Sequence, residues 1–150
     1  MSVGVRESDY IRWQNRAFRF YLASRVLAHN GLPGPMAFCA QQAIELLLKA
    51  TLVYWDRSFQ PTVAGHKFRT MIRTVGNKVP NGKGVLIPAY FFEDQRFLRV
   101  TRYPSPGRGV PIPHTLIVDL DRAFADFVAL VPFQFNSDLI AAVKGSDQRS

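Results

Sequence analysis

The side chains in this sequence that are best suited to chemistry are its basic ones, which are concentrated in the middle third. Residues 57–108 carry ten basic and two acidic side chains, and their excess equals the net charge of +8 of the whole 150-residue chain. Guanidinium and ammonium groups at regular spacing bind successive phosphates. The excess therefore favours a polyanionic partner, with nucleic acid first. A soluble surface whose acidic complement lies elsewhere, or on a partner protein, has the same composition.

Several of these cations recur at helical spacing. Arg12, Arg16 and Arg19 share one face of an expected N-terminal helix, where they either track phosphates or form a solvated surface. The other candidates for nucleotide or RNA binding are Lys67, Arg69 and Arg73, which face outward from a short helix, and Arg96, Arg99 and Arg102, which lie at successive steps of three. These rows predict a cationic flank built on two helices.

Other chemistries leave no comparable pattern. His29, His66 and His114 are far apart, and the single cysteine, Cys39, lies in an apolar stretch, so the spacing predicts neither a metal nor another cofactor. Residues 78–84, KVPNGKG, lack the preceding strand and the Gly-Lys-Ser/Thr ending of a phosphate loop. His66 is expected to bond a backbone group or to pack at a helix start.

These residues must be positioned by helices, because apolar side chains recur at steps of three and four throughout the chain. The predicted helices span about residues 8–30, 35–56, 66–77, 88–101 and 115–131, with loops at 57–65, 78–84 and 103–114. Ser8 or Asp9 is expected to cap the first helix and Thr115 the last. The sequence predicts an all-α, up-and-down bundle of four long helices and one short one over residues 1–135, followed by a partly mobile extension, 136–150.

The helix at 35–56 is expected to lie at the centre of the bundle because its apolar face is wide. Gln41, Glu45 and Lys49 form one polar ridge along it, which predicts a single solvated stripe with a Glu45–Lys49 pair four residues apart. Gln41 and Gln42 either hydrogen-bond across a dimer interface or are solvated. Because Glu45 and Lys49 interrupt the longest apolar segment, no membrane span is expected.

The composition also favours a reduced, cytoplasmic protein. The N-terminal stretch MSVGVRESDY is too polar for a secretory signal, and Cys39 has no second cysteine with which to pair. A length of 150 residues suits one domain with a single core. We therefore expect one cytoplasmic bundle.

Three segments together resemble a known family. They are FCAQQAIELLLKATLVYW at 38–55, Gly65-His66 before a short helix, and Arg102-Tyr103-Pro104 after the fourth helix. Over about residues 10–131 the chain looks like a HEPN domain, the helical bundle named as a nucleotide-binding domain of higher eukaryotes and prokaryotes. The resemblance implies a small dimerising bundle that binds RNA or nucleotides. Some members are metal-independent ribonucleases, often toxins neutralised by a nucleotidyltransferase partner, and others are non-catalytic modules.

The resemblance also implies site residues. Active members carry an Arg and a His four to six residues apart near the start of the last long helix, and Arg108 and His114 match that spacing here. Such a His removes the proton of the ribose 2′-hydroxyl or gives a proton to the leaving oxygen, while the Arg holds the phosphate. Pro111 and Pro113 between them exclude a regular helix.

Within the Arg-Tyr-Pro signature, Arg102 and Tyr103 are the preferred phosphate ligands. Glu45 and Lys49 are expected to pair with each other or with Arg102 rather than to catalyse.

These observations leave three hypotheses. The first is a HEPN-like domain that binds RNA or a nucleotide through the basic face of residues 57–108, as a homodimer and with little or no catalysis. The second is a metal-independent endoribonuclease, the toxin of a toxin–antitoxin pair, or else a protein-interaction subunit that partners a nucleotidyltransferase. The third is a small-molecule pocket lined by Trp13, Tyr21, Tyr54 and Trp55, although aromatic residues at these spacings usually form core.

Overall fold

The computed structural model describes residues 3–92 and 112–132, and the regular structure in both ranges is helical. The helices are α1 (Val3–His29), α2 (Pro33–Trp55), α3 (Pro61–Ala64), α4 (Phe68–Lys78) and α6 (Leu116–Val128), with 3₁₀ turns η1 (Gly82–Gly84) and η2 (Ala89–Phe91). These two ranges contain no strand. The predicted all-α bundle is confirmed.

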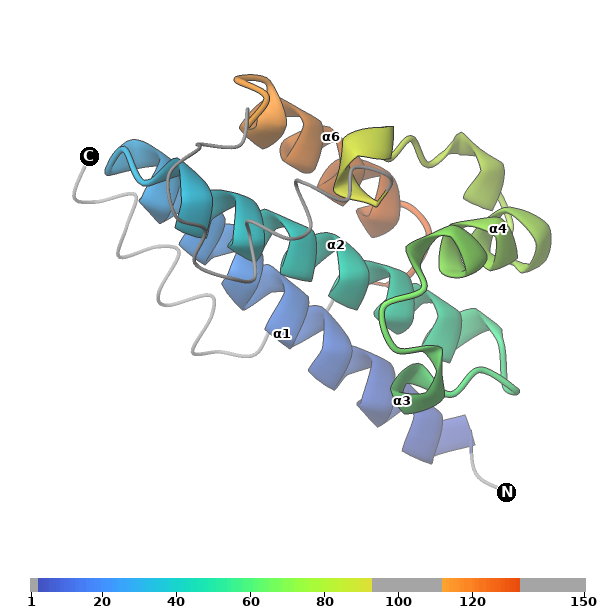
Figure 1. The fold of residues 1–150 in the computed structure, drawn as a ribbon. Coiled ribbons are helices and arrows are strands. Elements are labelled where there is room, and N and C mark those ends of the chain that lie inside the picture. The colour runs from blue at the N-terminus through green and yellow to red at the C-terminus, as the bar shows by residue number, and fades with distance from the viewer. Residues whose placement is uncertain (1–2, 93–111, 133–150) are drawn as a thin grey trace.

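Helices α1 and α2 form an antiparallel pair, seen along its length in Figure 1. Gly31 ends α1 because it adopts a left-handed conformation with φ of 68°, which is open to glycine at little cost. The Leu32 N–H then donates to the Leu27 carbonyl at 3.0 Å and closes the turn. Pro33 starts α2 in the first helical turn, where its missing N–H costs nothing.

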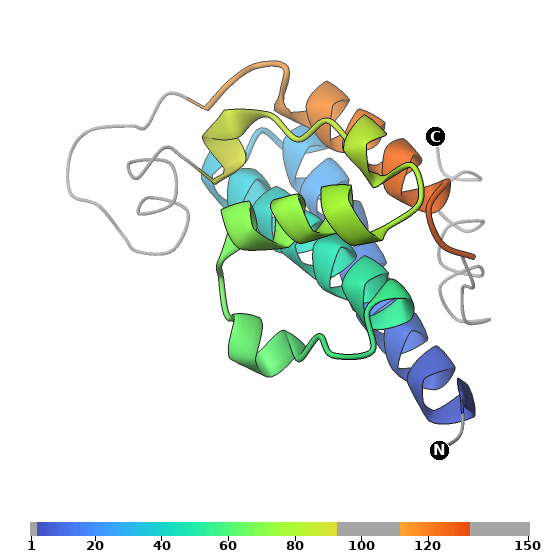
Figure 2. The ribbon, with the colours of Figure 1, turned by 90° about the vertical axis from the view of Figure 1, so that its right-hand side faces the viewer.

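Helix α2 is the centre of the bundle, because α1, α4 and α6 all pack against it. In the two ribbon views α2 lies between α1 and α4 (Figures 1 and 2). Ile44, Leu47 and Leu52 are among its fully buried side chains. By length and composition alone α2 passes as a membrane span, contrary to expectation, but 89% of that window is buried inside the bundle, as in a core helix.

Several predicted boundaries are wrong in ways that have a local cause. The first helix begins before Ser8 and Asp9, so neither residue caps it. The predicted loop 57–65 contains the single turn α3, which is too short to show helical periodicity. Thr115 precedes α6, but its hydroxyl donates to Asp119 at 3.1 Å and makes no cap bond to the backbone. Of the helix predicted at 88–101, the structure describes the start, which is the 3₁₀ turn η2.

The polar ridge of α2 is buried, so the predicted solvated stripe is wrong. The exposed fractions of Gln41, Glu45 and Lys49 are 0%, 2% and 7%. Periodicity assigns polar residues to solvent, but buried polar groups are tolerated when partners satisfy their hydrogen bonds. Glu45 and Lys49 are partners on the same helix, but His66 and Phe91, which also satisfy Glu45 and Gln41, are distant in sequence, so the sequence alone did not indicate that the ridge is buried.

Candidate functional site

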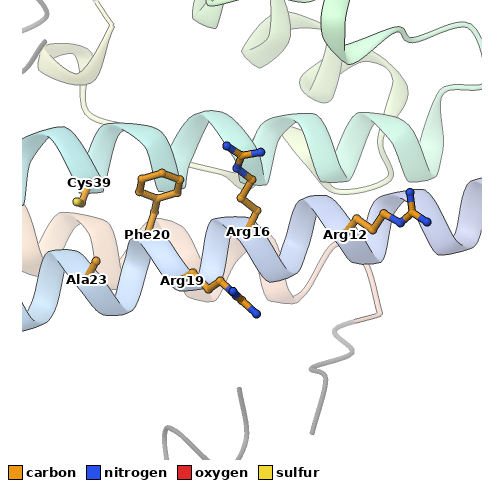
Figure 3. A pocket seen from close by; sticks show the side chains of 6 residues that line it. All are labelled: Arg12, Arg16, Arg19, Phe20, Ala23 and Cys39. Carbon is orange, nitrogen blue, oxygen red and sulfur yellow. The ribbon is translucent and has the colours of Figure 1, made fainter. Parts of the chain in front are cut away.

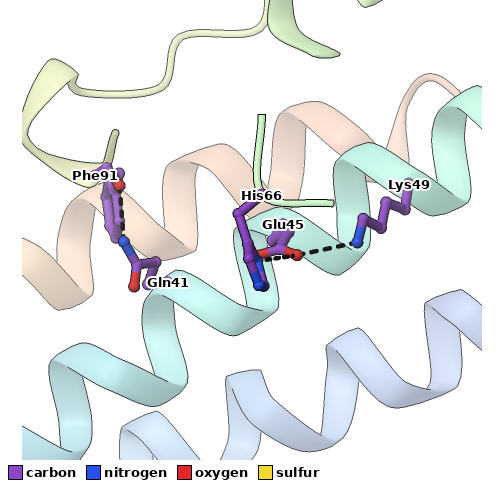
Figure 4. Close-up of polar contacts among 5 residues, drawn as sticks. All are labelled: Gln41, Glu45, Lys49, His66 and Phe91. Carbon is purple, nitrogen blue, oxygen red and sulfur yellow. Dashed lines mark hydrogen bonds and ion pairs between the residues drawn. The ribbon is translucent and has the colours of Figure 1, made fainter. Parts of the chain in front are cut away.

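A buried carboxylate on α2, that of Glu45, joins side chains from three segments into one polar site. The Glu45 side chain, 3% exposed, accepts a hydrogen bond from Lys49 Nζ at 3.0 Å, which confirms the predicted pair. Both Glu45 oxygens lie 2.9 Å from His66 Nδ1 (Figure 4). Lys49 Nζ lies 5.6 Å from the centre of the Trp13 ring, within cation–π range. Trp13, Glu45, Lys49 and His66 are hereafter the Glu45 cluster.

The cluster fixes the orientation of His66. Because Nδ1 faces a carboxylate, Nδ1 carries the hydrogen and donates it, which leaves Nε2 of a neutral ring as an acceptor. The His66 side chain is 59% exposed although Glu45 is buried. The turn that carries it is held by backbone bonds from Lys67 N–H to Ala64 and from Phe68 N–H to the His66 carbonyl, at 3.2 and 2.9 Å. The result is an oriented imidazole open to a ligand.

A second buried contact of α2 positions the turn η2, which follows α4 in the chain. The Gln41 side-chain amide donates to the Phe91 carbonyl at 3.1 Å and thereby fastens η2 to α2 (Figure 4). The Tyr90 hydroxyl donates to Asp119 at 2.8 Å and fastens the same turn to α6. The Gln41 side chain is therefore buried and hydrogen-bonded within its own subunit. Both predicted alternatives for Gln41, a hydrogen bond across a dimer interface and a solvated position, are wrong.

The basic candidates of the short helix lie on the exposed half of α4. Arg69 and Arg73 are exposed one turn apart on α4, and Lys67 is the exposed residue that directly precedes the helix. Lys67 borders a cavity of about 430 Å³ between α4, α3 and the end of α2. In that cavity Lys78 is neutralised by Asp56 at 3.1 Å. Burial alone raises the pKa of Asp56, but hydrogen bonds from Ser58 and Lys78 outweigh it and lower the pKa.

The arginine row of α1 borders a second concavity. Arg12, Arg16 and Arg19 are exposed beside a groove of about 550 Å³, whose floor is formed by Phe20 and by Ala23 and Cys39 (Figure 3). Burial raises the pKa of the Cys39 thiol, so the thiol stays neutral. The groove can receive an anion with an apolar part.

Arg25, further along α1, differs from that row because it has an internal partner. Its guanidinium donates to both Asp121 oxygens, at 2.5 and 2.6 Å, and Asp121 raises the pKa of Arg25. The Tyr21 hydroxyl donates to the same carboxylate, and burial together with Asp121 raises the pKa of Tyr21 to about 12. This site is a structural link between α1 and α6.

Comparison with family models decides which family these helices represent. The HEPN domain model matches residues 10–105, which is more than half of the chain. The chain belongs to the HEPN family. Comparisons with curated proteins and with solved structures gave no match. The matched region contains the Glu45 cluster and the exposed cations Lys67, Arg69 and Arg73, hereafter the α4 face, and it ends before Arg108 and His114.

Of the remaining candidates from the sequence, the structure describes only His114. His114 is exposed in the turn before α6. Arg96, Arg99, Arg102, Tyr103 and Arg108 lie outside the described residues, so their predicted roles stay predictions. Sequence reasoning missed the contact of His66 with Glu45. Both residues belong to the segments that resemble HEPN domains, but no pattern in the sequence indicates that two side chains 21 residues apart are in contact.

Three of the four aromatic residues considered as a pocket, Tyr21, Tyr54 and Trp55, contact other aromatic rings. Tyr54 makes edge contacts with Tyr10 and Trp55, with ring centres 4.8 and 5.2 Å apart. Tyr21 stacks on Phe124 at 4.3 Å. These contacts favour the core interpretation. In the two described ranges, 3–92 and 112–132, no group of three or more His, Cys, Asp or Glu side chains is placed to hold a metal ion.

Proposed function

We propose that this HEPN domain binds RNA or a nucleotide through the exposed half of α4. The supporting observation is that Lys67, Arg69 and Arg73 project from a helix whose other half is buried in the core. Lys67 and Arg69 also flank the start of α4, where the helix dipole favours an anion and no acidic residue occupies the first turn. A phosphate backbone that crosses α4 therefore meets three cations on a rigid support.

The distribution of ion pairs supports the same face. Two exposed basic residues on other parts of the domain are neutralised by acidic ones, Lys78 by Asp56 and Arg25 by Asp121. Lys67 and Arg73 form no ion pair with any residue in the described part of the chain. Their charge is left for an external anion.

The proposal also covers how the domain assembles and whether it cleaves RNA. HEPN membership supports a homodimer, and it also supports a complex with a nucleotidyltransferase or an antitoxin. The second candidate function is metal-independent RNA cleavage by Arg108 and His114, favoured by the exposure of His114 before α6. In that mechanism His114 takes the proton of the 2′-hydroxyl, whose oxygen attacks the phosphorus and displaces the 5′-oxygen; the 5′-oxygen leaves with a proton, and Arg108 holds the phosphate.

The test is the salt dependence of binding to a fluorescent single-stranded RNA, measured by anisotropy between 50 and 200 mM KCl. The double variant Lys67→Gln/Arg73→Gln removes two phosphate contacts. Each contact contributes about 0.7 to the slope of log K against log salt for a single strand, so the slope falls by about 1.4. The loss of affinity is then about sevenfold greater at 50 mM than at 200 mM.

The matched control is Arg12→Gln/Arg19→Gln, which removes the same charge from α1. Its slope is expected to stay close to that of the wild type. Equal slope changes in the two variants would mean general charge attraction, and a change in the α1 variant alone would move the site to the α1 groove. The same samples, kept in EDTA and run on a gel, test cleavage: product from the wild type that is lost in His114→Ala would establish the second function.

A further inference from the structure

The exposed edge of the Glu45 cluster lies next to the proposed RNA-binding face. His66 directly precedes Lys67, the first cation of that face, and its backbone carbonyl is bonded into the start of α4. Both side chains are exposed, so a strand that contacts Lys67 runs close to the backbone that carries the imidazole. The ring is held from behind by a carboxylate that is 3% exposed.

The orientation of the ring determines what it recognises. With Nδ1–H donating to Glu45, the neutral ring presents Nε2 as a hydrogen-bond acceptor. Phosphate oxygens accept hydrogen bonds, so a neutral ring in this tautomer has nothing to donate to them. The ribose 2′-hydroxyl is a donor, and it is the group that distinguishes RNA from DNA.

We propose that His66, oriented by Glu45, accepts a hydrogen bond from a ribose 2′-hydroxyl of RNA bound on α4, so that the domain prefers RNA to DNA. His66 is the contact residue and Glu45 is a positioning residue. The inference rests on the proposed function, because it needs a strand on the α4 face. It adds a specificity that the lysine and arginine contacts lack, since phosphates are common to both nucleic acids.

Glu45→Gln tests positioning without changing the size of the side chain. Lys49 Nζ donates to Glu45 Oε1 at 3.0 Å, so a glutamine at this position turns its oxygen toward Lys49. His66 Nδ1 lies 2.9 Å from both carboxylate oxygens, so in the variant its hydrogen faces one acceptor, which is shared with Lys49, and one NH₂ donor. The preference for the tautomer with hydrogen on Nδ1 is weakened, and part of the acceptor strength of Nε2 is lost.

The experiment compares the affinity of the full chain for three oligonucleotides of one sequence, at pH 7.5 and fixed salt. The three are RNA, DNA and 2′-fluoro RNA, which lacks the hydroxyl donor. The wild type is expected to bind RNA roughly fivefold more tightly than either analogue, the value of one ordinary hydrogen bond. This ratio falls to about one in His66→Phe and falls part of the way toward one in Glu45→Gln. His66→Gln, whose amide keeps an acceptor, retains part of the ratio.

Three outcomes overturn the proposal: a wild type that binds all three equally, a ratio that survives in His66→Phe, or a ratio that is lost in His66→Phe but unchanged in Glu45→Gln. Affinity for DNA should not change in His66→Phe, which separates loss of the hydroxyl contact from loss of the face. Failure of the proposed function would appear differently, as an unchanged salt slope in Lys67→Gln/Arg73→Gln. Thermal melts confirm folding, and if Glu45→Gln fails to fold, the two His66 variants decide the question.

Discussion

Removal of the buried carboxylate should destabilise this domain more than removal of the lysine paired with it. Glu45→Ala leaves the Lys49 ammonium, on a side chain 8% exposed, without the carboxylate that balances it. Breaking one side of a buried ion pair costs roughly 3–5 kcal/mol. The Trp13 ring, 5.6 Å from Lys49 Nζ, offsets part of this cost, so we expect about 3 kcal/mol. For a chain of this size that corresponds to a fall in melting temperature of about 9 °C.

Lys49→Met is expected to cost less, about 1–2 kcal/mol, because Glu45 keeps His66 at 2.9 Å and the methionine fills most of the space. In Glu45→Ala/Lys49→Met neither charge is left unpaired. The double variant should therefore lose less stability than the two single variants together, by at least about 1 kcal/mol.

Urea unfolding followed by circular dichroism gives the four free energies of unfolding. Additive costs would refute the reasoning, because they would mean that the two groups do not depend on each other. A Glu45→Ala cost below about 1 kcal/mol would refute it as well, since that value is typical of a solvated pair.

Two further predictions concern the loops around α4. In the folded protein the pKa of Asp56 is lowered, so the interactions of its carboxylate stabilise the fold above the unfolded pKa of 3.8. This stabilisation is lost as the pH falls below that value. The difference in the free energy of unfolding between wild type and Asp56→Asn, measured in urea, should therefore shrink toward zero between pH 5 and pH 2. Gly82→Ala would place a Cβ 2.1 Å from the Val75 carbonyl oxygen and should lower the free energy of unfolding by more than about 1 kcal/mol. Gly84→Ala, which has open space around it, should be near neutral when measured by the same urea unfolding.

Contacts between neighbouring turns were readable from the sequence, and contacts between distant segments were not. Helices α1, α2 and α6 follow from apolar residues at steps of three and four, and the Glu45–Lys49 pair follows from a spacing of four. The link between Arg25 and Asp121 joins residues 96 apart, and nothing local to either residue predicts it. The single turn α3 was missed because four residues are too few to show a period.

The polar ridge of α2 shows most clearly why the candidate site was only half visible. A charged stripe on a helix looks the same in sequence whether water or protein satisfies it. Burial forces each member to find a partner on another element: Glu45 reaches His66, and Gln41 reaches Phe91. These two bonds fasten the chain to α2 at residues 66 and 91, and the segment between them carries the α4 face. The ridge that was expected to face solvent therefore holds both ends of the segment that carries Lys67, Arg69 and Arg73. A substitution at Gln41 or Glu45 should therefore weaken RNA binding, although neither side chain is exposed enough to contact a phosphate.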